Sequence, residues 1–301
     1  MSQSLLIGSR GSKLALTQAR MVGDLLQARH PGLQVEIEVI HTRGDLDQGV
    51  LRSFGGVFTR EIEQALLEGR IHLAVHSLKD LPVEVEPELA LVASPEREDV
   101  RDVLISRQGN SLESLPQGAR LGTSSLRRRI QLQALRPDLD FADIRGNLDT
   151  RIAKVQRGEY EGIVLAAAGL HRLGWQERIS AYLEPAQVLP AVGQAALGLQ
   201  MRADQERRPL VEALNHPPTL AAVSAERSLL RSLGGGCQAP IAAWGRIEEG
   251  VLRVEGLVGK ADGTQLLRAE VSGVPAEAET LGVQLADQLR RQGADAWGGV
   301  A

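Results

Sequence analysis

The stretch SLLIGSRGSKLALTQARMVGDLLQARHPGLQVEIEV, residues 4–39, indicates the fold of the N-terminal part of the chain. Residues 4–8 form a short apolar run, typical of a strand. Residues 13–29 carry apolar side chains at helical spacing, with Ser12 as a candidate N-cap. Residues 34–41 then alternate apolar and polar side chains, which predicts a second strand. Strand–helix–strand order predicts a parallel sheet in an α/β domain.

The same pattern recurs along the chain. A helix at 58–68 and a strand at 71–75 continue the first unit, and the pattern starts again near Asp102. The second unit has predicted strands at 120–123, 141–144 and 162–166, and predicted helices at 125–135 and 147–157. After the breaker Asn215-His216-Pro217-Pro218, we expect a small α+β unit. Its predicted elements are a helix at 219–233, strands near 241–247, 251–258 and 265–271, and a helix at 276–291.

Composition excludes several classes of protein. The 301 residues suggest two or three domains, and 38 acidic against 34 basic residues argue against a general nucleic-acid binder. No apolar run reaches the ~18 residues that a bilayer span needs, and the N-terminus does not read as a signal peptide. A single cysteine excludes a disulfide framework and a cysteine-rich zinc site. We therefore expect a cytoplasmic protein with no metal site and no membrane partner.

Arginine accounts for 30 of the 34 basic residues, and its planar fork grips carboxylates with two hydrogen bonds. The segment GTSSLRRR, residues 122–129, ends a predicted strand and begins a helix, where free backbone N–H groups favour anions. Arg127 and Arg128 are therefore candidate anion ligands. The alternative is a capped surface helix with solvated arginines, which suits Arg129 better.

The next two predicted strands are also followed by arginines. Arg145 and Arg151 flank the start of a helix that Asn147 can cap, and Arg172 follows the strand at 162–166. Because parallel strands end at one edge of a sheet, these side chains should meet there and bind a ligand with many carboxylates or phosphates. The predicted convergent set is Arg127, Arg128, Arg145, Arg151 and Arg172, and Arg10 and Ser12 hold the matching edge of the first unit.

Two further positions are candidates for chemistry. Asp80, in VHSLKDLP (residues 75–82), offers a carboxylate that can stabilise a cation or accept a proton, although an aspartate before Leu-Pro is more often a turn residue. Cys237 follows three glycines that let a loop approach a ligand closely. It is either a nucleophilic attachment point or a small buried apolar residue.

Eight segments, in order, resemble the porphobilinogen deaminase family, also called hydroxymethylbilane synthases. They are IGSRGSKLAL, HTRGD, HLAVHSLKDLP, GTSSLRRR, IRGNLDTR, LAAAGLHRLG, LPAVGQAALG and GGGCQAPIA. The resemblance implies two α/β domains of the periplasmic-binding-protein type around a cleft, plus a small α+β C-terminal domain. The implied boundaries are 1–97 with 195–216 for the first domain, 98–194 for the second and 217–301 for the third.

The resemblance also implies the activity. Such an enzyme joins four porphobilinogen molecules, releases ammonia, and finally hydrolyses off hydroxymethylbilane. A dipyrromethane primer is held by a thioether, and Cys237 matches its attachment position. Asp80 and Lys79 match catalytic positions. Besides Cys237, the implied cofactor-binding residues are Lys79, Asp80, Thr123, Ser124, Ser125, Arg127, Arg128, Arg145 and Gly146. The implied substrate-binding residues are Arg10, Ser12, Arg145, Arg151, Arg172 and Gln194.

The chain departs from the family pattern at three places. The segment SFGGVF has Gly55-Gly56 without the usual lysine, and Ala195 stands where LPAVGQGA has glycine. The family's YDAI stretch reads Tyr160-Glu161-Gly162-Ile163 here. Two other functions stay open: a non-enzymatic anion-binding module, and a nucleic-acid-binding regulator that uses Arg127–Arg129. We expect a monomer that acts on a small molecule and binds no nucleic acid.

Overall fold

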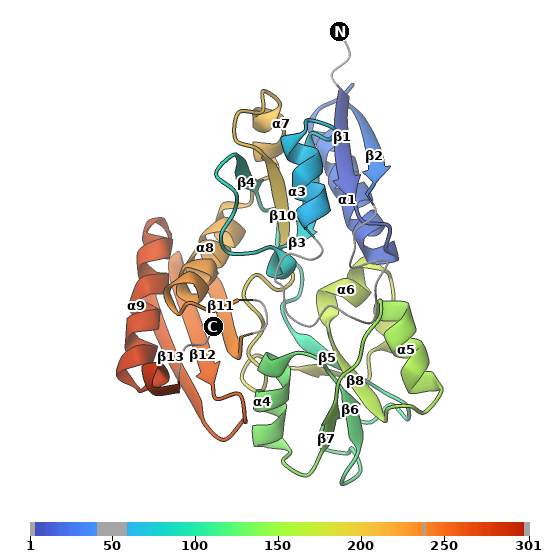
Figure 1. Cartoon of the computed structure of the whole chain (residues 1–301), viewed down its shortest axis with the longest axis vertical. Helices are drawn as coiled ribbons and strands as arrows, with labels where there is room; N and C mark the ends of the chain where they lie inside the picture. Colours follow the sequence, from blue (N-terminus) through green and yellow to red (C-terminus); the bar gives the residue numbers. More distant parts are fainter. Residues whose placement is uncertain (1–3, 41–58, 237–238, 298–301) are drawn as a thin grey trace. The chain divides into compact units, whose positions relative to one another are not determined.

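The computed structural model describes residues 4–40, 59–236 and 239–297 (Figure 1). The chain divides into two compact units. Unit 1 comprises Met1–Glu98 and Ala196–Leu220, and unit 2 comprises Asp99–Ala195 and Ala221–Ala301. Among the described helices, none is both long and apolar enough to cross a membrane.

Unit 1 is built on a five-stranded sheet with the order β2-β1-β3-β10-β4. Its strands are β1 (Ser4–Ser9), β2 (Gln34–Val39), β3 (Leu73–Ser77), β4 (Leu89–Ala93) and β10 (Leu197–Arg202). The predicted parallel pairing is confirmed for β1 with β2 and β3. It does not extend across the sheet, because β10 runs antiparallel to β3 and β4. Strand β10 begins at Leu197, more than one hundred residues after β4 ends at Ala93, so the chain returns to this sheet after forming the second one.

Helices cover both faces of this sheet. Helix α1 (Lys13–Arg29) packs Val22 and Leu26 in one core with Ile7 of β1. Helix α3 (Arg60–Leu67) packs against the opposite face, in a second core that includes Ala74 of β3. The short helix α7 (Arg208–Glu212) adds Val211 to the α1 side. Successive strand residues point to opposite faces, so one short strand contributes to both cores.

Unit 2 contains a second five-stranded sheet with the order β7-β6-β8-β5-β9. Its strands are β5 (Asp102–Ser106), β6 (Arg120–Gly122), β7 (Asp140–Ala142), β8 (Gly162–Ala166) and β9 (Ala181–Leu183). Strands β6, β7 and β8 are parallel, as predicted. Strand β5 runs antiparallel to β8 and β9, which the predicted pattern does not include.

The helices of the second sheet also lie on two faces. Helix α4 (Leu126–Leu135) contributes Leu132 to the core on one face. Helices α5 (Leu148–Gln156) and α6 (Ala167–Arg172) contribute Ile152 and Leu170 to the core on the other face. The predicted helix positions are therefore confirmed within a few residues. A single turn of 3-10 helix, η2 (Gln176–Arg178), precedes β9.

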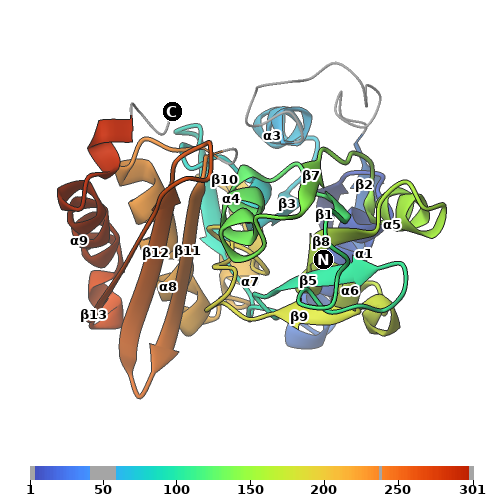
Figure 2. The ribbon, with the colours of Figure 1, turned by 90° about the horizontal axis from the view of Figure 1, so that it is seen from below.

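The third sheet is antiparallel, with the order β11-β12-β13. It comprises β11 (Ile241–Glu248), β12 (Val251–Gly259) and β13 (Leu266–Gly273). Helices α8 (Pro217–Ser232) and α9 (Ala278–Arg291) pack on one face, where Gly256 lies close to Leu229 and Leu285. On the other face Ile130 of α4 packs with Leu257. Figure 2 shows α4 beside this sheet, on the side opposite to α9. The short turns η3 (Pro275–Glu277) and η4 (Ala294–Trp297) flank α9.

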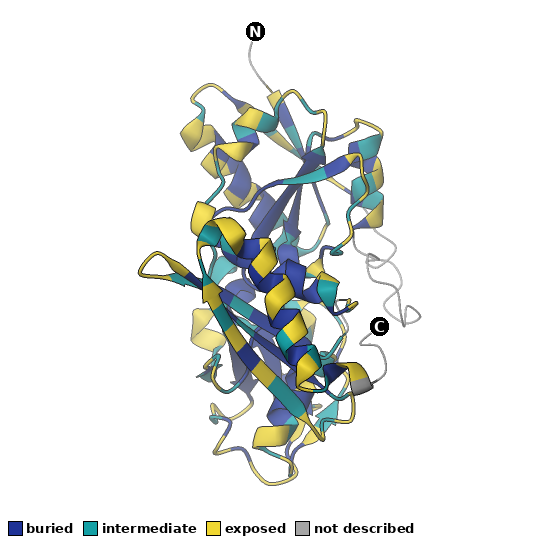
Figure 3. Ribbon diagram, turned by 90° about the vertical axis from the view of Figure 1, so that its left-hand side faces the viewer, coloured by how far each residue is buried: buried dark blue, intermediate teal, exposed yellow. Residues whose placement is uncertain are grey.

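Burial follows these layers. Figure 3 shows buried residues concentrated in the strands and on one side of α9, while its other side is exposed. The predicted α+β character of the C-terminal part is confirmed. The described part of the chain has a mixed α/β architecture with two five-stranded sheets and one small antiparallel sheet.

His76 of β3 is a buried titratable group in unit 1. Its Nε2 lies 2.9 Å from Oε1 of Gln200, and the Gln200 amide donates to Glu63. Burial lowers the pKa of His76 to about 4, although the Gln200 contact opposes the shift. The folded protein therefore holds this imidazole neutral near pH 6, where the unfolded chain takes up a proton.

We expect His76 to make the free energy of unfolding decrease as the pH is lowered. The folded pKa lies below the unfolded value, so its contribution is complete above pH ~6.5 and is lost as pH falls toward about 4. Between pH 7 and 4.5 the loss should be about 2 kcal/mol. Urea unfolding of His76→Gln, which keeps a donor toward Gln200, should show a correspondingly flatter pH dependence. Identical slopes for parent and variant would contradict this assignment.

Candidate functional site

The second sheet gathers chain ends at one edge. Strands β6 and β8 are parallel, so the segments that follow Gly122 and Ala166 leave the sheet at the same edge. Strand β5 runs the other way, and its first residue, Asp102, pairs with Ala166 at the end of β8. The Asp102 carboxylate therefore lies at the edge of the sheet from which the segments after β6 and β8 lead into their helices.

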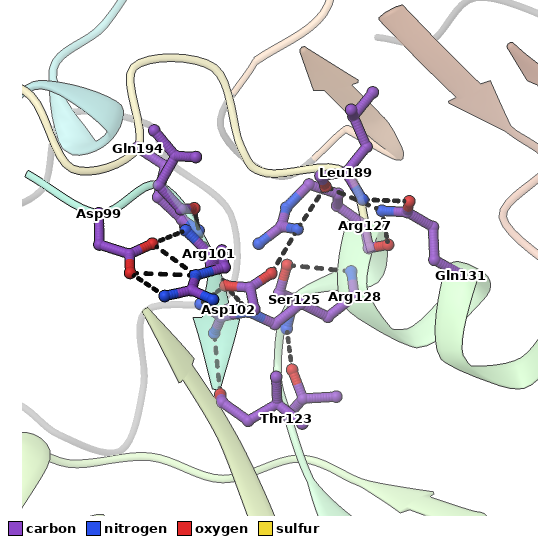
Figure 4. A network of polar contacts seen from close by, with 12 residues as sticks. Asp99, Arg101, Asp102, Thr123, Ser125, Arg127, Arg128, Gln131, Leu189 and Gln194 are labelled. Carbon is purple, nitrogen blue, oxygen red and sulfur yellow. Dashed lines mark hydrogen bonds and ion pairs between the residues drawn. The ribbon is translucent and has the colours of Figure 1, made fainter. Parts of the chain in front are cut away.

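Asp102 is fully buried and pairs with both predicted anion-binding arginines (Figure 4). Arg127 Nη1 donates to Oδ2 at 2.7 Å. Arg128 donates to Oδ1 from Nη2 at 2.7 Å and from Nε at 3.1 Å. Arg127 is 4% exposed and Arg128 is 7% exposed, so neither is a solvated surface arginine. Arg129, by contrast, is exposed, as the sequence suggests.

The pKa shifts follow from this packing. Burial alone raises the pKa of Asp102, but the charges and hydrogen bonds of Arg127 and Arg128 outweigh it and hold that pKa well below its ordinary value. Burial and the neighbouring Arg128 lower the pKa of Arg127, although Asp102 opposes the shift. A guanidinium stays protonated even so. The three groups together thus carry one net positive charge inside the protein.

Some N–H groups of the two arginines donate hydrogen bonds to backbone carbonyls of the protein. Arg127 Nη1 also donates to the Leu189 carbonyl at 2.8 Å, and Arg128 Nη1 donates to the Val164 carbonyl at 2.9 Å. Arg127 Nε is buried and has no hydrogen-bond partner among the residues that the structure describes. A buried donor without a partner is costly unless a ligand satisfies it. One net positive charge and an unpaired guanidinium donor suit a carboxylate ligand.

The segment between Leu189 and Ala195 is held beside the arginine pair at several points. The Gln131 side chain accepts from the Leu189 N–H at 2.7 Å and donates to the Leu189 carbonyl at 3.1 Å. Glu226 of α8 accepts from the Gly193 N–H at 2.7 Å. Gln194 is fully buried, and its amide donates to Asp102 Oδ1 at 2.9 Å.

Hydroxyl residues shape the start of α4. Ser125 is the N-cap and accepts from the Arg128 N–H, as its place before the helix predicts. Thr123 Oγ1 accepts from the Ser125 N–H. Ser124 bonds both the N–H and the carbonyl of Ile144, which ties the loop after β6 to the loop after β7. These contacts fix the backbone on which the arginine pair is carried.

The other predicted arginines of unit 2 adopt separate arrangements. Arg145 is exposed, and Gly146 beside it has a φ of 112°. Arg151 Nε donates to the Gly146 carbonyl at 2.7 Å, and Arg172 Nη2 donates to the Ala195 carbonyl at 2.6 Å. The parallel strands β6, β7 and β8 thus end at one edge of the sheet, as predicted. The guanidiniums of Arg151 and Arg172 bond backbone carbonyls there, whereas Arg127 and Arg128 bond Asp102.

Unit 1 presents its own set of predicted residues. Ser12 caps α1 by accepting from the Ala15 N–H at 3.3 Å. Lys79 and Asp80 lie in η1 (Leu78–Asp80), which follows β3, and Asp80 is exposed. Since β1 and β3 are parallel neighbours, Arg10 and Ser12 leave the sheet at the same edge as this turn.

The glycine-rich loop is described up to Gly236. Gly234 has a φ of 68° and ends α8, and a Cβ on Gly235 would lie 2.5 Å from Ile241. A Cβ on Gly236 would meet no atom of the described residues within 4 Å. The backbone conformation therefore accounts for Gly234, and the close packing of Ile241 accounts for Gly235. The predicted attachment residue Cys237 lies outside the described residues, as do Gly55 and Gly56.

Sequence reasoning missed Asp102 and Gln131 as parts of the site. Asp102 opens DVLIS, a strand in which every residue is buried, and an acidic residue in such a strand is a signal for a buried partner. Gln131 has no comparable signal, because its amide acts on the backbone of a distant segment. Nowhere in the described chain does the structure bring together three histidine, cysteine or carboxylate side chains that could hold a metal ion.

The chain matches two family models. Residues 5–209 match the porphobilinogen deaminase, dipyromethane cofactor binding domain. Residues 220–291 match the porphobilinogen deaminase, C-terminal domain. The two matches together span most of the chain.

Curated relatives are similar over almost the full length. A porphobilinogen deaminase from Syntrophobacter fumaroxidans is 48% identical over 96% of this chain and 94% of its own length. A porphobilinogen deaminase from Roseiflexus sp. is 49% identical over 97% of this chain and 98% of its own length. Among solved structures, the methionine binding protein MetQ has a TM-score of 0.44 at 12% identity and covers 70% of this chain and 89% of its own.

Ala195 carries a testable backbone strain, because its φ of 70° lies in the left-handed region. We expect Ala195→Gly to raise the free energy of unfolding by roughly 0.5–1 kcal/mol, since glycine adopts this conformation without strain. Ala196→Gly is the matched control: Ala196 is equally buried but has no positive φ, so its loss should be destabilising. If both variants lower the free energy of unfolding in urea by the same amount, the backbone of Ala195 is not strained.

Proposed function

The chain belongs to the porphobilinogen deaminase family, and from this premise we infer that it joins four porphobilinogen molecules head to tail. Each addition releases ammonia, and hydrolysis finally releases hydroxymethylbilane for tetrapyrrole synthesis. The observation that carries the inference is the sequence identity of 48% and 49%, over 96% and 97% of this chain, to curated enzymes of this name. The buried arginine pair of unit 2 supports it, because every pyrrole of the substrate brings carboxylates.

The described residues fit a dipyrromethane cofactor. Arg127 has a buried donor without a partner beside a cluster of one net positive charge, and such a site suits a carboxylate side chain of the cofactor. We propose that Arg127, Arg128 and the loop residues Thr123, Ser124 and Ser125 hold it, with Cys237 as its covalent attachment point. When bound, the group supplies the carbon nucleophile on which the chain is extended.

Asp80 is the proposed catalytic carboxylate. It is exposed on η1, which is anchored by the buried side chains of Leu78 and Leu81 on either side of the exposed turn. A carboxylate at this position stabilises the positive charge that develops on the porphobilinogen pyrrole as ammonia leaves. It also offers an acceptor for the pyrrole proton. Lys79 lies in the same turn and is proposed to act with Asp80.

The remaining predicted residues complete the proposed substrate site. Arg145 is exposed, and the backbone carbonyl of Gly146 accepts from Arg151 Nε at 2.7 Å. A carboxylate-rich substrate is suited to guanidinium forks. The proposed substrate ligands are Arg10, Ser12, Arg145, Arg151, Arg172 and Gln194, and Arg145 and Gly146 are proposed to contact the cofactor as well.

We propose that the three sheets correspond to three domains, residues 1–97 with 195–216, residues 98–194 and residues 217–301. Each proposed domain contains one sheet, and β10 joins the first sheet from the returning segment. The enzyme is proposed to act as a cytoplasmic monomer on a small molecule, without nucleic acid.

Intact mass tests the covalent cofactor. We expect protein from cells that make porphobilinogen to weigh more than its sequence by two linked pyrrole units. Cys237→Ala should lose the whole increment, because no other thiol is present. A parent mass equal to the bare sequence after incubation with porphobilinogen would instead favour a non-enzymatic anion-binding module.

Asp80→Asn tests the catalytic carboxylate. The neutral amide cannot offset a developing cation, so turnover should fall by about 100-fold or more while the cofactor mass is retained. Asp24→Asn, which removes an exposed carboxylate from α1 in the same unit, is the matched control and should keep parent activity. Turnover of Asp80→Asn within a few-fold of the parent would remove Asp80 from the assigned role.

A further inference from the structure

We propose that Asp102 is a positioning residue of this enzyme, acting through Arg127 and Arg128 on the carboxylate that they bind. The inference rests on the proposed function, since it assumes that the arginine pair holds a pyrrole carboxylate. It adds a residue that neither the sequence motifs nor the resemblance singled out. Asp102 has no exposed surface and therefore acts through its neighbours.

The geometry fixes both guanidiniums. Asp102 accepts one hydrogen bond from Arg127, two from Arg128 and one from Gln194. Backbone carbonyls take one further N–H from each arginine. A planar guanidinium held at two or more points cannot rotate freely, so its remaining N–H groups keep set directions. The unpaired Arg127 Nε is one of these groups.

Charge gives Asp102 a second effect. Two buried guanidiniums side by side repel each other, and burial of an unpaired charge is costly. The single carboxylate reduces the charge of the cluster from two positive to one, which one ligand carboxylate can then neutralise. Asp102 thus allows the pair to be assembled before any ligand arrives, and such preorganisation strengthens binding.

The link to Gln194 extends this role. The Gln194 side-chain amide donates two hydrogen bonds, one to Asp102 Oδ1 at 2.9 Å and one to the Val100 carbonyl at 2.8 Å. Asp102 is therefore a common acceptor for α4, through its arginines, and for the segment from Leu189 to Gln194. A carboxylate that merely stabilised the fold would lower stability when removed, but it would leave folded molecules fully competent.

A double-mutant cycle separates these roles. The variants are Asp102→Asn, Arg128→Gln and the double variant, each produced in cells that make no porphobilinogen. Asp138→Asn is the control, because Asp138 forms a two-point ion pair with Arg136 in the same unit, outside this cluster. The readouts are the urea midpoint of the apo-protein, the rate of primer attachment by intact mass after porphobilinogen is added, and kcat/KM of the loaded fraction.

We expect Asp102→Asn to slow primer attachment and lower kcat/KM at least tenfold in folded protein, while Asp138→Asn stays within twofold of the parent. In the Arg128→Gln background, Asp102→Asn should cost no more than about threefold, since contacting residues that act together are not additive. The double variant has the parent's net cluster charge, so its urea midpoint should exceed that of Asp102→Asn alone.

Parent-like attachment and kcat/KM in Asp102→Asn would overturn the proposal, as would a full tenfold cost in the Arg128→Gln background. If Asp102→Asn does not fold, a tenfold or greater cost of Asp102→Asn in the Arg128→Gln background still overturns the proposal. A parent protein that neither attaches a primer nor turns over porphobilinogen would refute the proposed function itself, which is a different result.

Discussion

One buried carboxylate between two guanidiniums holds the site of unit 2 together. Asp102 joins the start of β5, the first turn of α4 and the segment that ends at Gln194. Removal of one partner from a buried ion pair typically costs about 3–5 kcal/mol, because it leaves an uncompensated charge. Here two buried cations would remain, each still bonded to one backbone carbonyl. The charge balance of this edge of the sheet therefore depends on Asp102, while Gln131, Glu226 and Ser124 also hold its loops.

Strand direction places that carboxylate. In a wholly parallel sheet the first residue of β5 would lie at the edge opposite to the helix-starting loops. Because β5 runs antiparallel to β8, Asp102 lies beside Ala166 at the edge from which α4 and α6 also start. Unit 1 likewise has one strand, β10, that returns against its neighbours β3 and β4. In unit 1 the reversed strand also brings a distant part of the sequence to the parallel core, because β10 (Leu197–Arg202) lies far along the chain from β4 (Leu89–Ala93).

Arginine suits this position better than lysine. Each guanidinium bonds the Asp102 carboxylate and a backbone carbonyl at once, and it still has N–H groups for a ligand. An ammonium group is more strongly hydrated and costs more to bury. For an enzyme of the porphobilinogen deaminase family, whose substrate carries carboxylates on each ring, a partly satisfied guanidinium pair is a fitting receptor. The excess of arginine over lysine in the chain is consistent with this use.

Local sequence patterns were enough to predict the parallel cores, the helix that Ser12 caps, and the loops in which the candidate ligands lie. These features depend on periodicity and capping within about twenty residues, which are local. The packing of the folded chain was needed to reveal that Arg127 and Arg128 share Asp102 and that Gln194 is fully buried. The antiparallel directions of β5 and β10 also became clear only from the fold. Those outcomes depend on which distant segments pack together, because a buried charge selects its partner by proximity in space and not by distance along the chain.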